Sequence, residues 1–197
     1  MKTLLTVIGI LLLATILFFV IGVISPGQRT FSEIQVNVPI DYCWQFYHDE
    51  VLKNEWMSGI EKYELVSGKK NTVGAEYVLT MEAKAGKASK TYETVTDFDP
   101  VSSYAITYHN DMLTGSTEVE FKDQGDSSTL ILTENEYKAK TNFLRSMFHF
   151  FNWKIEEESK KQEETMKLLM EEEYMKKRKN KPNPKPQAMP VDTSRVN

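Results

Sequence analysis

Cysteine and histidine are scarce in this sequence. A single cysteine, Cys43, and three histidines, His48, His109 and His149, occur among its 197 residues. One cysteine cannot form an internal disulfide, and no histidine lies at HExxH spacing or near a CxxC pair. We therefore expect no disulfide, no metal site, no iron–sulfur cluster and no other cofactor.

An excess of basic residues is also missing. The formal net charge is −4 and the pI is near 5.5, whereas nucleic-acid binders normally carry a basic face. There is no GxSxG motif and no recognisable base beside Cys43, so the apparatus of nucleophilic catalysis is absent. We expect no nucleic-acid partner and assign no catalytic residue, and no pattern identifies a protein partner.

Charge is entirely absent from one long segment. Residues 4–24 read LLTVIGILLLATILFFVIGVI, and about 20 apolar residues suffice for a helix to cross a bilayer. The alternative is a cleaved signal peptide, whose apolar core is only about 7–15 residues long. We predict that residues 1–27 form a single-pass transmembrane anchor. Lys2 and the amino terminus weakly favour a cytoplasmic N-terminus, which would place the rest of the chain outside the cytoplasm.

Period-two alternation begins after this segment. Ile34, Val36 and Val38 alternate with polar residues up to Pro39, which we expect to open a short helix. A second short helix is predicted over residues 52–56. Turn residues then separate six predicted strands, at about 60–67, 74–83, 88–98, 102–110, 113–122 and 128–139. This order favours an α+β fold with an antiparallel meander.

A long helix is predicted over residues 143–175. Leu144, Met147, Phe148, Phe151 and Ile155 share one face, which we expect the sheet to grip. Ser159 and Gln162 interrupt this face before Met166, Leu169 and Met170 restore it. Residues 28–175 should form one domain, and residues 176–197 a basic, proline-rich disordered tail. The basic residues that open this tail suit a helix C-terminus, anionic lipid headgroups or simple solubility.

The order of these elements resembles the helix-grip domain of the START-like superfamily, in particular its polyketide cyclase/dehydrase-type SRPBCC branch. The motifs that carry the resemblance are VNVPIDYCWQFYHD, NEWMSGIEKYELVSG and TYETVTDFDPVSSYAITY, and it covers about residues 29–172. It implies a curved antiparallel sheet of about six or seven strands wrapped on the last helix. It also implies a cavity between sheet and helix for a lipid, a polyketide or another small hydrophobic ligand.

Candidate ligand contacts follow from the inward-facing positions of these predicted elements. They are Trp56, Tyr77, Leu79, Tyr92, Ile106, Tyr108, Val119, Phe121, Leu132, Met147 and Phe151, with Met147 and Phe151 expected at the cavity floor. The leading hypothesis is a membrane-anchored binding domain for a small hydrophobic ligand.

Two alternatives remain open. A cyclase or dehydratase would use Tyr77, Tyr92, Tyr108 or Glu134 as acid or base, although buried tyrosines more often pack and hydrogen-bond. An envelope or stress protein would fill the domain with its own side chains and act through surface contacts.

Overall fold

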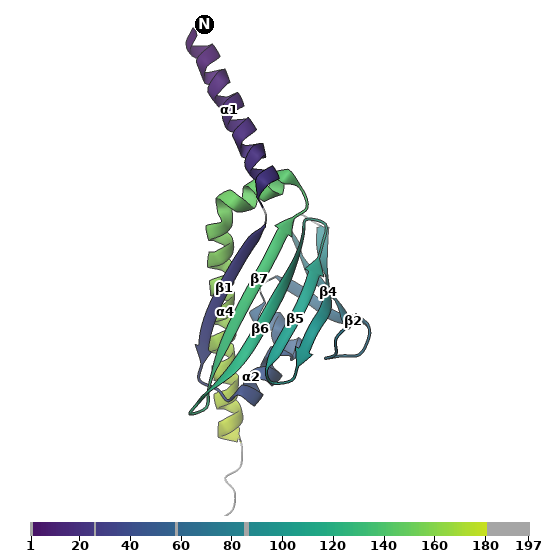
Figure 1. The fold of residues 1–197 in the computed structure, drawn as a ribbon. Coiled ribbons are helices and arrows are strands. Elements are labelled where there is room, and N and C mark those ends of the chain that lie inside the picture. Colours follow the sequence, from purple (N-terminus) through teal and green to yellow (C-terminus); the bar gives the residue numbers. More distant parts are fainter. Residues whose placement is uncertain (1, 26, 58, 85–86, 181–197) are drawn as a thin grey trace, which may run out of the picture.

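The computed structural model describes residues 2–25, 27–57, 59–84 and 87–180 (Figure 1). The elements follow the chain as α1 (Lys2–Ile24), β1 (Gln28–Val36), α2 (Ile40–Tyr47), α3 (Glu50–Trp56), β2 (Ile60–Ser67), β3 (Glu76–Lys84), β4 (Lys87–Asp99), β5 (Ser103–His109), β6 (Leu113–Gly125), β7 (Ser128–Ala139) and α4 (Asn142–Asn180). The α+β class and the element order are confirmed. The predicted strand bounds differ from these by a few residues at most.

The strands form one antiparallel sheet in the order β1-β7-β6-β5-β4-β3-β2. Every consecutive pair from β2 to β7 is adjacent, as a meander requires, while β1 pairs with β7 at the far edge. The predicted meander is therefore confirmed. The sheet lies along the part of α4 that follows its first turns (Figure 1), and α2 and α3 both contact α4.

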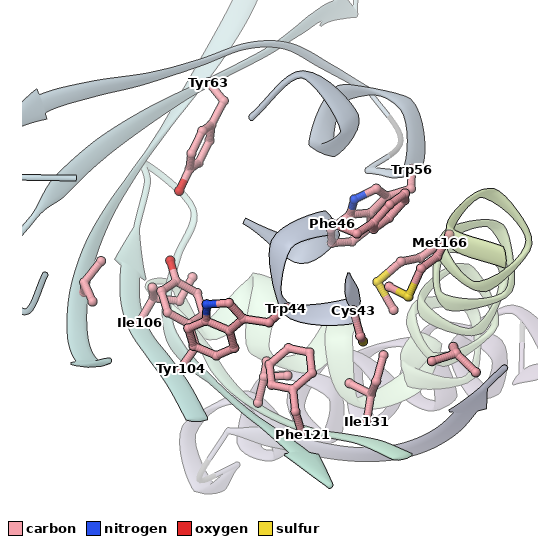
Figure 2. Close-up of a cluster of buried hydrophobic side chains, with 14 of the residues drawn as sticks. Cys43, Trp44, Phe46, Trp56, Tyr63, Tyr104, Ile106, Phe121, Ile131 and Met166 are labelled. Atoms are coloured by element: carbon pink, nitrogen blue, oxygen red, sulfur yellow. The ribbon is translucent and has the colours of Figure 1, made fainter. Parts of the chain in front are cut away.

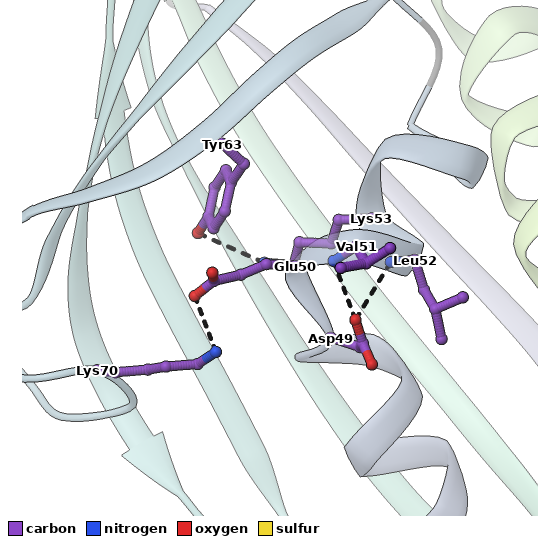
Figure 3. A network of polar contacts seen from close by, with 7 residues as sticks. All are labelled: Asp49, Glu50, Val51, Leu52, Lys53, Tyr63 and Lys70. Carbon is purple, nitrogen blue, oxygen red and sulfur yellow. Dashed lines mark hydrogen bonds and ion pairs between the residues drawn. The ribbon is translucent and has the colours of Figure 1, made fainter.

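Two short helices, α2 and α3, connect β1 to β2 in the chain. Asp49 caps α3, because its Oδ1 accepts hydrogen bonds from the backbone N–H groups of Val51 at 2.9 Å and Leu52 at 3.3 Å (Figure 3). The cap starts α3 two residues before the predicted start at Leu52. It also fixes the helix that carries the buried side chains of Lys53 and Trp56.

The hydrophobic core lies around α2. Cys43 and Phe46 of α2 are enclosed by Phe121 and Ile131 of the sheet and by Met166 of α4 (Figure 2). Burial of such side chains contributes about 1.5–3 kcal/mol each. The core therefore occupies one end of the sheet's concave face and leaves the other part of that face to a cavity.

Helix α4 has a kink at Phe151, where φ is −114° and ψ is 17°. We call the segment before the kink, residues 142–150, the arm. The arm packs against α1. Ser146 Oγ donates a hydrogen bond to the Phe18 carbonyl at 2.5 Å. The prediction that the sheet grips residues 143–155 thus differs from the structure. The part of α4 that crosses the sheet begins near Lys154 and is anchored by Met166 and Met170.

The end of α4 lies beyond the predicted end at Met175. The helix continues to Asn180, so the first residues of the predicted tail are helical. Residues 181–197 lie outside the described part of the chain.

Removing all residues after Tyr174 should leave the free energy of unfolding within about 0.5 kcal/mol of the full chain. Tyr174 itself packs on Tyr42 with ring centroids 4.9 Å apart, and an aromatic pair contributes about 0.5–1.5 kcal/mol beyond its buried area. Tyr174→Ala in the full chain should therefore lower stability by more than the truncation does. Urea unfolding followed by near-UV circular dichroism measures the free energy of unfolding of both variants. A larger loss in the truncation than in Tyr174→Ala would contradict this account.

Candidate functional site

A cavity of about 620 Å³ lies between the concave face of the sheet and α4. Its lining comes from β1, α2, α3, β2, β4, β5, β6, β7 and the part of α4 after the kink. The lining residues are Thr30, Tyr47, Lys53, Trp56, Met57, Tyr63, Thr91, Glu93, Tyr104, Ile106, Tyr108, Thr117, Thr133, Asn135, Tyr137, Lys154, Ile155, Glu158, Ser159, Gln162, Glu163 and Met166. The volume falls within the roughly 300–1,000 Å³ typical of small-molecule sites.

Hydroxyl groups and amides face this space from both walls. The sheet presents Thr30, Thr91, Thr117, Thr133 and Asn135. Of these, Thr117 donates a hydrogen bond to Asn135 at 2.7 Å. The wall formed by α4 presents Ser159, Gln162 and Glu163 at this level. The cavity is therefore amphipathic, with the aromatic rings and Met166 supplying its carbon surface.

A buried polar cluster, Lys53, Tyr63 and Glu93, lies at the α3 side of the cavity. Lys53 Nζ lies 3.5 Å from the Tyr63 hydroxyl (Figure 3), which donates to Glu93 Oε2 at 3.2 Å. Lys53 and Glu93 are only 6% and 7% exposed. Burial lowers the pKa of Lys53 and raises the pKa of Glu93, while the opposite charge of each partner counters the shift of the other. Burial so complete is rare for these residue types unless they are paired.

Tyrosine rings surround the Lys53 ammonium group. Its Nζ lies 4.5 Å from the ring centroid of Tyr63 and 5.7 Å from those of Tyr47 and Tyr104, within reach of cation–π attraction. Figure 2 shows the Tyr63 and Tyr104 hydroxyls pointing toward one another. Burial raises the pKa of these tyrosines, and that of Tyr108 to about 12. They are therefore neutral at physiological pH and act as hydrogen-bond donors as well as acceptors.

One buried donor in the cavity wall has no partner in the described chain. Trp56 is 7% exposed, and its Nε1 makes no hydrogen bond. A buried N–H without an acceptor costs about 1–3 kcal/mol, and buried Trp side chains usually find a partner. Trp56 also lines the cavity, so this unpartnered donor belongs to a residue of the cavity wall.

Gly115 gives Tyr108 its position in the wall. The two residues face each other across β5 and β6, and a Cβ at Gly115 would lie 2.6 Å from the Tyr108 hydroxyl and 2.4 Å from the Glu136 carbonyl. No side chain fits there, so the Tyr108 ring lies over bare backbone.

The predicted ligand contacts occupy four different places. Trp56, Ile106 and Tyr108 line the cavity, whereas Tyr77, Leu79, Val119 and Phe121 are buried in the core. Tyr92 and Leu132 lie on the other face of the sheet. Tyr92 stands between Thr91 and Glu93, which line the cavity, and Leu132 stands between the core residue Ile131 and the cavity-lining Thr133. Met147 belongs to the arm, and Phe151 stands at the kink with 42% of its surface exposed. The kink therefore moves the expected floor of the cavity from residues 147–151 to residues 155–166.

The residues proposed as catalytic acids or bases also lie in different parts of the structure. Tyr108 alone of the proposed acids and bases lines the cavity. Tyr77 stacks on Tyr63 with centroids 4.8 Å apart, Tyr92 stacks on His109, and Glu134 forms an ion pair with Arg29. Lys53, Tyr63 and Glu93, which the sequence analysis did not select, are the titratable groups in contact with one another here.

Sequence signals for these missed residues did exist. Val95 is apolar, so strict alternation places Glu93 and Thr91 on the same inward face and Tyr92 on the opposite one. Ser159 and Gln162 interrupt the apolar face of the last helix because a cavity, rather than packed core, lies against them. No comparable signal marks Lys53, whose position depends on how α3 packs.

No family model and no curated protein matches the chain by sequence. Solved structures do match. A conserved protein from Geobacillus kaustophilus has a TM-score of 0.62 at 9% identity, covering 73% of this chain and 95% of its own. The Zhui aromatase/cyclase from Streptomyces sp. R1128 has a TM-score of 0.60 at 14% identity, covering 73% and 93%. A START superfamily protein from Mycobacterium smegmatis has a TM-score of 0.59 at 13% identity, covering 73% and 99%.

The chain has the START-like fold. Identities this low establish the architecture of the START-like domain and leave its chemistry to its own residues. Within the described residues, no three His, Cys, Asp or Glu side chains gather closely enough to hold a metal ion.

Proposed function

We propose that this protein is a membrane-anchored START-like domain that binds a small hydrophobic molecule carrying an acceptor oxygen. The observation that carries the proposal is the unpartnered Trp56 Nε1–H in the wall of a 620 Å³ cavity, on the same short helix as Lys53. An oxygen atom near both groups would accept from an indole N–H and an ammonium group. Apolar chains or rings would occupy the rest of the cavity.

Support for the anchor comes from the fit of α1. An 18-residue stretch of α1 has a mean hydropathy of 3.1, and a Cβ at Gly22 would lie 2.0 Å from the Asn142 carbonyl of α4. A cleaved leader needs no such close fit to the mature domain, so retention of α1 is the interpretation we adopt. The weak charge bias of the flanking residues favours a domain outside the cytoplasm.

A ligand with a carboxylate or carbonyl oxygen suits the charges of the cavity better than a pure hydrocarbon. The polar cluster holds one cation and one potential anion, and the neutral tyrosines add donors around them. A pure hydrocarbon would remove water from these polar groups without offering them a hydrogen-bond partner, which is unfavourable. Fatty acids and ketone-bearing ring systems share the required chemistry.

Trp56→Phe should weaken binding of a fluorescent fatty acid about tenfold, because about 1–1.5 kcal/mol of hydrogen-bond energy is lost while the ring remains. Trp153→Phe is the matched control, since Trp153 is exposed and does not line the cavity. Fluorescence titration of both variants measures the effect. Equal affinity in Trp56→Phe and the wild type would overturn the assignment of Trp56.

Acid–base catalysis is a second candidate function, supported by the buried contact of Lys53, Tyr63 and Glu93. The aromatase/cyclase among the structural neighbours is consistent with it. Incubation with a candidate ligand distinguishes the two functions: chemical conversion that Glu93→Gln abolishes supports an enzyme, and recovery of unchanged ligand supports a binding domain.

A further inference from the structure

The arm of α4 and the three residues that follow it, 151–153, carry large aromatic side chains that the rest of the described chain leaves about half exposed. Phe143 and Trp153 are 51% and 57% exposed, and Phe150 and Phe151 are exposed to a similar degree. Together these four residues are called the aromatic surface. Several large apolar side chains left exposed on one short segment mark a contact with another molecule or with a membrane.

The arm is also fixed against α1. Ser146 is fully buried and donates to the Phe18 carbonyl at 2.5 Å. The ring of Phe18 packs on Phe143 and Phe150 with centroids 5.7 and 5.8 Å apart. Gly22 leaves room for the Asn142 carbonyl. The arm thus has a defined height along α1.

This height can be compared with the thickness of a bilayer. Helix α1 has 23 residues, a length of about 34 Å, whereas a hydrocarbon core is about 30 Å thick. Nearly all of α1 is therefore needed to cross the membrane. Phe18 lies about 9 Å before the last residue, Ile24. The contacts at Phe18 and Gly22 consequently place the arm at the edge of the hydrocarbon core, and not in the water beyond it.

We infer that the arm is an interfacial helix and that the aromatic surface inserts into the phospholipid bilayer beside α1. This inference rests on the proposed role of α1 as a membrane anchor. Figure 1 shows the arm crossing the base of α1 before α4 turns down along the sheet. Interfacial helices lie about 5–10 Å into the boundary between headgroups and acyl chains, and Trp and Lys are enriched there. Lys154 Nζ lies 5.3 Å from the Trp153 ring, so it can neutralise lipid phosphate at the same level.

The arm also connects the bilayer with the cavity. Lys154 and Ile155, directly after the kink, line the cavity, and the Tyr137 hydroxyl donates to Asn152 at 2.9 Å. An inserted arm therefore holds one wall of the cavity against the lipid phase. A hydrophobic molecule would reach the cavity from the bilayer with little exposure to water.

Brominated phospholipids test this inference on the full-length protein in liposomes. Bromine atoms near the headgroup end of the acyl chains should quench Trp153 strongly, and bromine atoms near the chain ends should quench it less. Trp44 and Trp56 are buried at 8% and 7% exposure. Trp153→Phe should therefore lose most of the shallow quenching. Equal shallow quenching in Trp153→Phe and the wild type would overturn the inference.

A glycine pair shows whether α1 holds the arm in place. Gly22→Ala forces the helices apart, because its Cβ would meet the Asn142 carbonyl, whereas Gly9→Ala has nothing within 4 Å of its Cβ. We expect altered Trp153 quenching in Gly22→Ala and wild-type quenching in Gly9→Ala. Identical quenching in both would contradict the role assigned to α1.

Failure of the anchor itself has a separate readout. Release of the protein from liposomes by alkaline carbonate would refute α1 as a membrane span and, with it, the inference. Retention in the pellet with unquenched Trp153 would refute the inserted arm alone. A crosslinked dimer in that case would assign the aromatic surface to a second copy of the chain.

Discussion

Lys53→Met should lower the free energy of unfolding by about 3–5 kcal/mol at neutral pH, the range found when one partner of a buried charged pair is removed. Lys53 is 6% exposed and approaches the Tyr63 hydroxyl, which in turn donates to Glu93. Methionine fills a similar volume but leaves Glu93 without a nearby cation. The loss should appear as a lower midpoint in urea unfolding.

Lys70→Met is the matched control for this variant. Lys70 forms an ion pair with Glu50 at 2.9 Å, but its side chain is 50% exposed (Figure 3). Exposed pairs contribute about 0–1 kcal/mol, so this variant should remain close to the wild type. Similar losses in the two lysine variants would contradict the structural role given to the polar cluster.

The pH dependence of Lys53→Met gives a further check. Burial raises the pKa of Glu93 in the folded state, so the folded protein binds this proton more readily than the unfolded chain. The unfavourable negative charge on Glu93 is present when the pH is above the pKa of Glu93 in the folded state, and it disappears as the pH falls through that pKa. The deficit of Lys53→Met should therefore shrink on acidification. The double variant Lys53→Met/Glu93→Gln should recover part of the loss at neutral pH.

Ser159→Trp should abolish ligand binding while the domain stays folded. Ser159 lines the cavity from α4 and is only half-buried, so an indole ring at this position projects into open volume of about 620 Å³. Filling existing space avoids the strain of about 1–3 kcal/mol that overpacking a dense core produces. We expect a loss of affinity of at least about 100-fold, since the ring occupies the ligand's own volume.

Lys160→Trp is the matched control for the blocked cavity. It is the next residue on α4, it is exposed, and it does not line the cavity. The affinity of the Lys160→Trp variant for the fluorescent fatty acid should equal that of the wild type. Equal loss in both variants would mean that helix disruption, rather than cavity filling, explains the effect.

Much of the fold follows from local patterns in the sequence. Alternation and turn residues give β2 to β7 nearly their observed bounds, and Pro39 correctly separates β1 from α2. These features depend on residues close together in the chain. Pairing of β1 with β7 brings together residues about a hundred positions apart, and no local pattern in the sequence predicted it.

The site was less predictable because it depends on tertiary packing. The apolar face from Leu144 to Ile155 indicates a buried helix, but it does not reveal that α1 supplies part of the cover. Nor does it show that a kink at Phe151 changes the helix direction. The burial of Lys53 depends on where α3 lies relative to Glu93, two segments with no periodic relation in sequence. Ser159 and Gln162 were noticed as interruptions, and the structure explains them as cavity-lining positions.

Native mass spectrometry of the full-length protein, released from membranes in detergent micelles, tests the central claim most directly. The account predicts a bound small hydrophobic molecule with at least one oxygen on the wild type and on Lys160→Trp, and none on Ser159→Trp. An unliganded mass for the wild type, together with no change in melting temperature across fatty acids, alcohols and ketones, would contradict it.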